Sequence, residues 1–290
     1  MTCRTGLDEV EVALLDAIDL LGADDAGEPV TCARVLQVVS GRGQASSVAA
    51  YRALLRRGVP WSVHLPLVEL FGNAGSRDHR PADPEHVEVR LSRVGSLAIA
   101  AERHEAGPVP LGIIEGSLCR DGDQPPFAPS VVVSALLAGR TDLGAPELPT
   151  GCAVVGDLAA LAEGRPTVLT IRSTIRAEGG HLVITEIPYG VGPEELWTTV
   201  HDARAALKAV NESCPMRRIV DESSRRDGVR LYVEPEKGAD LRDLRDWLLR
   251  IRPVQRTATW RLPAPAVAIV SGWDREDGSG LRALADLLRG

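Results

Sequence analysis

The stretch His181–Ile187, HLVITEI, opens the part of the sequence that decides the fold. Apolar and polar residues alternate along it and along Thr167–Arg172, and a period of two predicts strands. The elements predicted downstream are a helix with Leu196, Val200, Ala203 and Leu207 on one face, strands at Arg218–Asp221 and Val229–Val233, a helix through Leu241, Leu244, Leu248 and Ile251, and a closing strand at Ala266–Val270. The order from His181 is βαββαβ, which predicts a split βαβ sheet covered on one side by two helices.

The N-terminal part of the chain is predicted to be helical. Apolar residues three and four positions apart mark a first helix that stops at Gly22, namely Leu7, Val10, Leu14, Ile18 and Leu21. Thr31–Val39 predicts a second helix, and Ser46 or Ser47 caps a third that runs to Gly58. The extended, proline-bounded piece Trp61–Val68 follows, so these segments predict a helix-turn-helix unit with a wing.

A boundary region separates the two patterns. Proline, glycine and aspartate are frequent between Gly107 and Pro149, around one apolar run, Val131–Leu137. A short helix is predicted at Leu281–Leu288, at the end of the chain. The predicted class is therefore α+β. The predicted domains are residues 1–106, residues 107–273 and a C-terminal helical connection at residues 274–290.

Composition narrows the class of protein. With 290 residues, 44% hydrophobic and 25% charged, the chain can bury a core, and no stretch reaches the roughly 20 apolar residues of a membrane span. The start lacks a signal-peptide pattern, so we expect a cytoplasmic protein without a membrane partner. The cysteines are scattered singly, which favours free thiols over a metal site: Cys3, Cys32, Cys119, Cys152 and Cys214.

The net charge bears on nucleic-acid binding. The chain carries a formal charge of −7, whereas a protein that clamps duplex DNA must offset a dense row of phosphates. One basic face could still coexist with an acidic remainder. The charge therefore weakens a DNA-binding interpretation without removing it.

Three blocks of sequence, in order, match a known family. The first comprises ARV at 33–35, Tyr51, PLVELFGNAGS at 66–76 and EVRL at 88–91; the second is LPTGCAVVG at 148–156; the third comprises TEIPY at 185–189, VDESS at 220–224 and VRLYVE at 229–234. Together they resemble the breakage-reunion region of the A subunit of type IIA DNA topoisomerases, gyrase and topoisomerase IV. The resemblance implies a winged-helix domain followed by a tower-like domain that carries the βαββαβ sheet. It also implies no cofactor in this chain, because the family's magnesium and ATP lie on the partner B subunit.

The chain departs from the family at the residues that attack and hold the DNA phosphate in that family. In the family a tyrosine hydroxyl attacks a DNA phosphodiester, and His86 stands at that tyrosine's position here. Glu85 replaces a neighbouring arginine that holds the phosphate, and the segment Gly43–Ser47 lacks the basic groups of the corresponding helix. The resemblance is thus to a divergent form, and one that we expect to be truncated before the second dimer gate.

Substitute nucleophiles are weak candidates. The three tyrosines, Tyr51, Tyr189 and Tyr232, lie in blocks whose pattern favours packing. A histidine can attack phosphorus in principle. However, the shorter imidazole of His86 would stop several ångströms short of a phosphate placed for a phenol, and Glu85 would repel that phosphate.

Three hypotheses remain. The leading one is a gyrase A-like pseudoenzyme that has lost DNA cleavage and acts by binding a gyrase B-like or gyrase A-like subunit, or a second copy of itself as a homodimer. The alternative is a divergent topoisomerase A subunit that breaks and rejoins DNA with an ATP-hydrolysing partner. The third is a module that binds duplex DNA without chemistry, through Arg34, Arg52, Arg56, Arg57 and Arg90.

Overall fold

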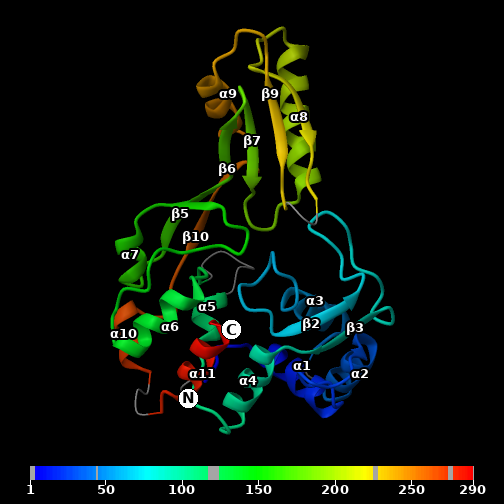
Figure 1. Cartoon of the computed structure of the whole chain (residues 1–290), viewed down its shortest axis with the longest axis vertical. Coiled ribbons are helices and arrows are strands. Elements are labelled where there is room, and N and C mark those ends of the chain that lie inside the picture. Colours follow the sequence, from blue (N-terminus) through cyan, green and yellow to red (C-terminus); the bar gives the residue numbers. More distant parts are fainter. Residues whose placement is uncertain (1–3, 44, 117–123, 225–227, 274–276, 290) are drawn as a thin grey trace.

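The computed structural model describes residues 4–43, 45–116, 124–224, 228–273 and 277–289. It is elongated, with both ends of the chain at one end of the molecule and a sheet with two helices at the other (Figure 1). Buried apolar side chains form two cores. The lower core draws on Leu7 to Ile171 and on Trp260 to Ala285, and the upper core on Ile175 to Val254.

Three helices near the N-terminus confirm the helical prediction. They are α1 (Glu9–Leu20), α2 (Cys32–Gly41) and α3 (Ser47–Arg56). Asp8 starts α1 with a capping box, because its carboxylate accepts from the Glu11 N–H while the Glu11 side chain accepts from the Asp8 N–H. Ser46 caps α3 as its hydroxyl predicts. All three helices bury their apolar faces in the lower core.

A small antiparallel sheet packs on these helices. Its order is β1-β3-β2, formed by β1 (Val30–Thr31), β3 (Val87–Leu91) and β2 (Val68–Gly72). The prediction of an extended piece at Trp61–Val68 is wrong, since the N–H groups of Ser62 and Val63 both turn back to the Val59 carbonyl and the strand begins only at Val68. β2 and β3 thus form the hairpin that follows α3.

Further helices complete the lower part. They are α4 (Arg93–Glu102), α5 (Leu111–Glu115), α6 (Pro129–Ala138), α10 (Ala266–Ser271) and α11 (Ser279–Leu287). The closing strand predicted at Ala266–Val270 is wrong, because this segment is α10. It buries Ala266, Ile269 and Val270 and leaves Val267 exposed, which is the spacing of one helix face. Packing in the core here overrides the strand preference of its β-branched residues.

A three-stranded sheet links the lower and upper parts. Its order is β10-β5-β4, from β10 (Gln255–Trp260), β5 (Thr167–Arg172) and β4 (Ala153–Val155), with α7 (Leu158–Ala162) beside it. β5 confirms a predicted strand, whereas β10 lies where no strand was predicted. β10 and β5 run antiparallel along their full length.

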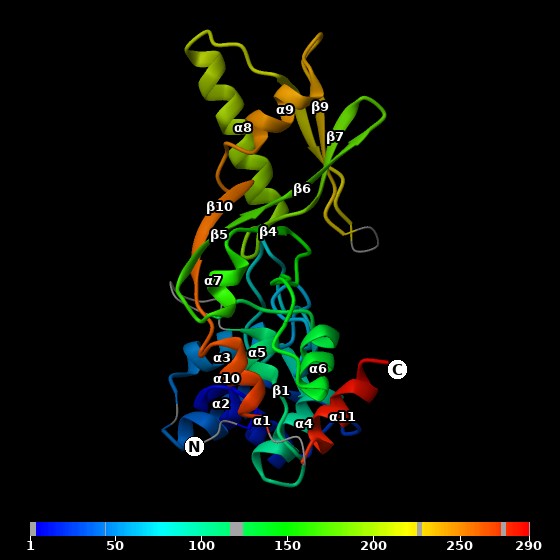
Figure 2. The same ribbon diagram turned by 90° about the vertical axis from the view of Figure 1, so that its left-hand side faces the viewer.

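The upper part is a four-stranded antiparallel sheet with order β6-β7-β9-β8. Its elements are β6 (Thr174–Glu178), β7 (His181–Glu186), α8 (Pro193–Ala209), β8 (Met216–Asp221), β9 (Leu231–Pro235) and α9 (Leu241–Leu248). Both helices lie on one side of the sheet (Figure 2), where Leu196 of α8 and Leu244 of α9 meet the buried strand residues. The expected split sheet differs in one strand. β6 occupies the edge of this sheet in place of the predicted closing strand Ala266–Val270, which is α10, and β10 belongs to the linking sheet.

The α+β class is therefore confirmed. The winged-helix and tower descriptions and the domain limits at 106 and 273 stay predictions. Within the described ranges, no helix has the length and apolar character needed to cross a bilayer.

Candidate nucleic-acid interface

His86 lies in a tight turn directly before β3, and both His86 and Glu85 are exposed. The turn closes with the His86 N–H donating to the Asp83 carbonyl at 2.9 Å. On the neighbouring strand Gly72 has φ +90°, and a β-carbon there would come within 2.7 Å of the His86 carbonyl oxygen. The glycine thus lets the end of β2 pass close under residue 86.

Neighbouring elements fix the position of this turn. The Tyr51 hydroxyl on α3 donates to the Ala82 carbonyl at 2.7 Å, and the Ala33 N–H at the start of α2 donates to the Pro84 carbonyl at 3.0 Å. The three-helix unit and the hairpin therefore hold residue 86 at a defined place on the surface.

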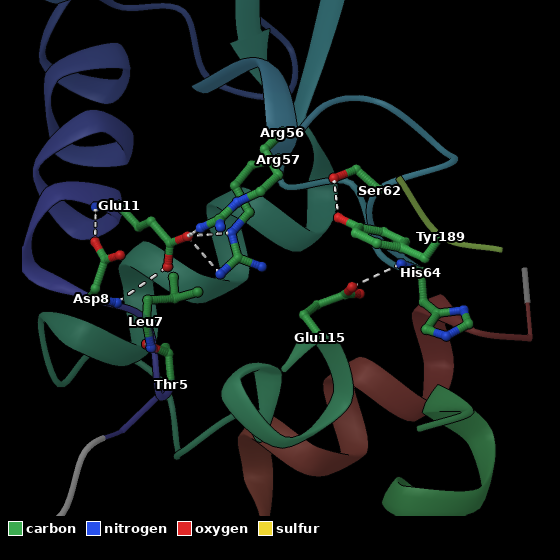
Figure 3. Close-up of polar contacts among 10 residues, drawn as sticks. All are labelled: Thr5, Leu7, Asp8, Glu11, Arg56, Arg57, Ser62, His64, Glu115 and Tyr189. Atoms are coloured by element: carbon green, nitrogen blue, oxygen red, sulfur yellow. Dashed lines mark hydrogen bonds and ion pairs between the residues drawn. The ribbon is translucent and has the colours of Figure 1, made fainter. Parts of the chain in front are cut away.

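The tyrosines are engaged in packing and hydrogen bonds. Burial raises the pKa of Tyr51 to about 12, with the charges of Cys32, Asp83 and Glu85 adding to the effect, so the phenol stays protonated. The Tyr189 hydroxyl lies 2.9 Å from the Ser62 hydroxyl (Figure 3). The Tyr232 ring packs on His181 with ring centres 4.7 Å apart, far along the chain in the upper sheet. The hydroxyls of Tyr51 and Tyr189 are thus engaged in hydrogen bonds within the chain, and Tyr232 lies in the upper sheet, away from the His86 turn.

Carboxylates surround the turn. Asp83, Glu85 and Glu88 are all exposed, and Glu85 is adjacent to His86. A phosphate brought to this turn would meet like charge at short range. The local electrostatics thus oppose the approach of a nucleic-acid backbone.

Two of the five predicted DNA-contacting arginines face solvent. Arg34 follows Ala33, which anchors the turn, and Arg52 follows Tyr51 on α3. In the described part of the chain, neither has an ion-pair partner within 4 Å. These two cations remain available on this face.

Arg56 and Arg57 have a different environment. Both contact the buried Glu11 carboxylate, at 2.8 Å from Arg56 Nη2 and 2.6 Å from Arg57 Nη2 (Figure 3). Burial opposes ionisation of Glu11, but the hydrogen bond and charge of Arg57 and the charge of Arg56 outweigh it, and the pKa of the carboxyl falls below its usual value. The two arginines therefore neutralise an internal carboxylate, so unlike Arg34 and Arg52 they are engaged in ion pairs within the chain.

Arg90 is likewise engaged. Its guanidinium pairs with Glu69 across the β2–β3 hairpin at 2.7 Å and lies over the Phe71 ring, 5.5 Å from the ring centre. Arg42 and Arg103, nearby on the lower part, pair with Asp16. None of these ion pairs was apparent from the sequence. One signal was present for the pairing of Arg56 and Arg57: Glu11 stands among the apolar residues of the first helix, which marks it as a buried acid that needs a partner.

Metal binding has no support among the described residues, where no three histidine, cysteine or acidic side chains gather in a way that could hold an ion. Cys32, Cys152 and Cys214 are free thiols. Cys3 and Cys119, and Gln44 of the Gly43–Ser47 segment, lie outside the described residues.

Comparisons with known proteins agree with the motifs. No protein-family model matches the chain. The DNA gyrase A subunit of Thermotoga maritima is 30% identical over 279 aligned residues, which cover 82% of this chain and 34% of the relative. The chain resembles a type IIA topoisomerase A subunit. The DNA topoisomerase 4 A subunit of Streptococcus pyogenes is 27% identical over 246 residues, covering 71% of this chain and 29% of the relative.

A shorter match points the same way. Topoisomerase subunit TopoM of Mycolicibacterium smegmatis is 35% identical over 115 residues, covering 39% of this chain and 15% of the relative. The gyrase A-like chain spans about a third of the length of the first two relatives. The activity and partners of the whole relatives are thus matters for proposal.

Proposed function

We propose that this gyrase A-like protein does not cleave DNA and acts by binding another topoisomerase subunit or a second copy of itself. The observation that carries the proposal is the turn at His86. An imidazole sits there beside Glu85, where the family resemblance implies a tyrosine beside an arginine. Cleavage needs a nucleophile that forms a covalent bond to phosphorus and a cation that steadies the phosphate, and both groups are replaced.

The charges on this face support the same conclusion. Exposed carboxylates flank residue 86, and Arg56, Arg57 and Arg90 are paired within the chain. DNA affinity depends on how many phosphates a protein neutralises, and this face offers Arg34 and Arg52. Duplex DNA is therefore a poorer ligand than a protein surface.

The proposed architecture follows the resemblance. We assign the winged helix to α1, α2, α3 and the β2–β3 hairpin, within residues 1–106. We assign the tower to the upper sheet with α8 and α9, within residues 107–273. A protein that keeps the fold of the family but lacks its catalytic groups is suited to occupy the place of the gyrase A-type subunit in an assembly.

A pull-down tests the binding role. The intact protein, immobilised, is incubated with purified gyrase B or, in a separate experiment, with purified gyrase A, while its own oligomeric state is measured by analytical ultracentrifugation. Capture of either one, or a stable homodimer, supports the proposal. A folded monomer that captures neither of them contradicts it.

A cleavage assay separates this proposal from the divergent enzyme. Supercoiled plasmid is incubated with the protein, gyrase B, magnesium and ATP, and the mixture is denatured to trap any covalent adduct. We expect no adduct. An adduct that disappears in the His86→Phe variant would establish the enzyme instead.

A further inference from the structure

The upper part of the molecule has its own core and joins the lower part over a narrow connection. The chain enters it after β5 and leaves it into β10, and the Ser173 N–H donates to the Val254 carbonyl at 2.9 Å where the two strands meet. Tyr189, which follows β7, bonds Ser62 of the lower part and accepts from Arg256 of β10, so this contact lies beside the same strands. A part held in this way can swing about the two strands unless a further contact fixes it.

A further contact lies on the other side of the base of the upper part. The loop between β2 and β3 rises beneath α8, whereas β5 and β10 join the upper part at the opposite side (Figure 1). One oxygen of the Asp78 carboxylate in this loop accepts from the Glu194 N–H at 3.2 Å, and the other accepts from the Glu195 N–H at 3.3 Å. The two parts are therefore also tied at a point away from the two-strand connection.

The start of α8 is suited to an acceptor from outside the helix. Its N-cap residue is Gly192, which has no side chain to accept the first N–H groups of the helix. A β-carbon on Gly192 would lie 1.7 Å from Asp78 Oδ1, so the carboxylate occupies the space that a capping side chain would need. A negative charge is also favourable at a helix N-terminus. α8 thus receives from the lower part the cap that its own sequence lacks.

The loop holds Asp78 in a defined conformation. The Ser76 hydroxyl accepts from the N–H groups of Asp78 and His79, at 3.2 and 3.0 Å, and the Ser76 N–H donates to the His79 carbonyl at 3.0 Å. At the base of the loop the Ala82 N–H donates to the Asn73 carbonyl at 2.9 Å. Because the loop is already ordered by its own hydrogen bonds, little conformational entropy is lost when Asp78 meets α8.

We propose that Asp78 is a latch that fixes the tilt of the upper part. With the latch closed, the two-strand connection and the contact with α8 hold the upper part at two separated points. With the latch open, the upper part moves as a body about β5 and β10 while its own core stays packed. This device goes beyond the proposed function and is independent of the partner that the protein binds.

The surroundings of the latch allow it to open without unfolding α8. The contact borders an open pocket of about 430 Å³, whose lining residues are Asp78, His79, Glu194, Glu195, Thr198 and Thr199. Water in this pocket can bond the N–H groups that Asp78 releases, as it does at many helix ends. Loss of the latch therefore changes the position of the helix and leaves its secondary structure intact.

A distance measurement on the intact chain tests the proposal. Nitroxide labels are attached to a ketone-bearing unnatural residue at positions 20 and 202, which are exposed on α1 and α8, and double electron–electron resonance gives the distribution of distances between them. We expect Asp78→Ala to widen this distribution by at least about twofold. Hydrogen exchange of the peptide that contains residues 192–197 should become at least about tenfold faster in the same variant. Circular dichroism should show unchanged helix content.

Gly192→Ala and one control variant separate the latch from a general loss of stability. The added β-carbon of Gly192→Ala displaces Asp78 and should widen the distribution like Asp78→Ala, whereas the double variant should be no wider than Asp78→Ala alone, because the latch is already open. Asp83→Ala removes another exposed carboxylate of the same loop and should leave the distribution unchanged.

Three results would overturn the proposal. The first is a folded Asp78→Ala variant with the distance distribution of the unmodified protein. The second is a double variant in which the two widening effects add in full. If Asp78→Ala does not fold, an unchanged distribution in Gly192→Ala is the third, because that substitution opens the same contact from the side of the helix.

Discussion

The guanidinium of Arg57 lies 2.6 Å from the carboxylate of Glu11, and both side chains are buried. The two residues are 46 positions apart, at the end of α3 and in the first turn of α1. Their pairing ties the helix that precedes the β2–β3 hairpin to the first helix of the chain. An arginine that the sequence alone places on a DNA-binding face is thus part of the interior.

The interior role of Arg57 predicts a stability effect. Arg57→Ala leaves the buried Glu11 carboxylate with Arg56 alone, and we expect the free energy of unfolding to fall by roughly 3 kcal/mol. Urea unfolding followed by circular dichroism measures it. Arg52→Ala, on the exposed side of α3, serves as the control and should change stability by less than about 0.5 kcal/mol. Equal effects of the two substitutions would contradict the internal assignment.

The charge distribution predicts weak, mildly salt-dependent DNA binding by this face. Two unpaired arginines correspond to a slope of log affinity against log salt of about −2 for duplex DNA. Arg34→Ala and Arg52→Ala should each reduce the slope by about 1, whereas Arg57→Ala should leave it unchanged. Fluorescence anisotropy with a labelled duplex gives the slope. A value steeper than about −5 would show a basic surface elsewhere on the chain.

Restoring a phenol at residue 86 should not restore cleavage. His86→Tyr replaces an exposed side chain, so we expect stability to change by less than about 0.5 kcal/mol. With gyrase B, magnesium and plasmid, we expect no covalent adduct, because Glu85 and Asp83 still repel the phosphate. The double variant Glu85→Arg/His86→Tyr tests the charge separately. An adduct with His86→Tyr alone would show that the missing phenol is the whole defect.

Stability should decrease as the pH rises through neutrality. The folded-state pKa of Glu115, about 7, exceeds the ordinary 4.5, so between these values the folded protein binds more protons than the unfolded chain. The stabilisation is complete below about pH 4.5 and is lost as the pH rises through about 7, by up to about 3 kcal/mol. Glu115→Gln should remove this decline in urea unfolding measured across the range.

Two other carboxyls act in the opposite direction at lower pH. Glu11 and Asp16 have lowered pKa values, because their arginine partners outweigh the effect of burial. Their stabilisation is present above the ordinary pKa values of 4.5 and 3.8 and is lost as the pH falls below them. Stability should therefore peak on the acidic side of neutrality. A profile that rises steadily to pH 8 would contradict the Glu115 assignment, and stability that does not fall below about pH 4 would contradict those of Glu11 and Asp16.

The close approach under residue 86 predicts the effect of one methyl group. Gly72→Ala must place a β-carbon at φ +90° and 2.7 Å from the His86 carbonyl oxygen. We expect a loss of about 1–3 kcal/mol in unfolding free energy. Gly43→Ala also has positive φ but an open surrounding, so it isolates the cost of the backbone angle. A loss no larger than that of Gly43→Ala would show that β2 can shift freely beneath the turn.

The parts of the fold that the sequence predicts are those governed by local pattern. The helices around Leu14 and Leu54 follow from the spacing of their apolar residues, and Ser46 marks a start by its side-chain chemistry. The error at Ala266–Val270 arose because β-branched residues favour strands, whereas the core of this protein accepts them on one helical face. The strand β10 was not predicted because its partner, β5, lies far away in the sequence. The strand β6 pairs with the adjacent β7 across the Gly179–Gly180 turn, and it was missed although two glycines before a predicted strand are a hairpin signal.

The candidate site shows the same division. The place of His86 and Glu85 in the family motif follows from the resemblance, and the acidic residues around them are visible in the sequence, whereas the turn that holds residue 86 is known only from the structure. The partners of Arg56, Arg57 and Arg90 depend on which helices and strands meet, and local pattern carries no information about that. Side-chain charge in a sequence is therefore a weak guide to surface charge.

The antiparallel pairing of β5 with β10 has a structural consequence for the upper part. Its first and last residues are adjacent where the Ser173 N–H meets the Val254 carbonyl at 2.9 Å, so the whole segment between them departs from and returns to one spot. Such a segment can be exchanged as a unit. A short β-turn could replace it without changing the path of the rest of the backbone, and a different insert could be grafted onto the same stem.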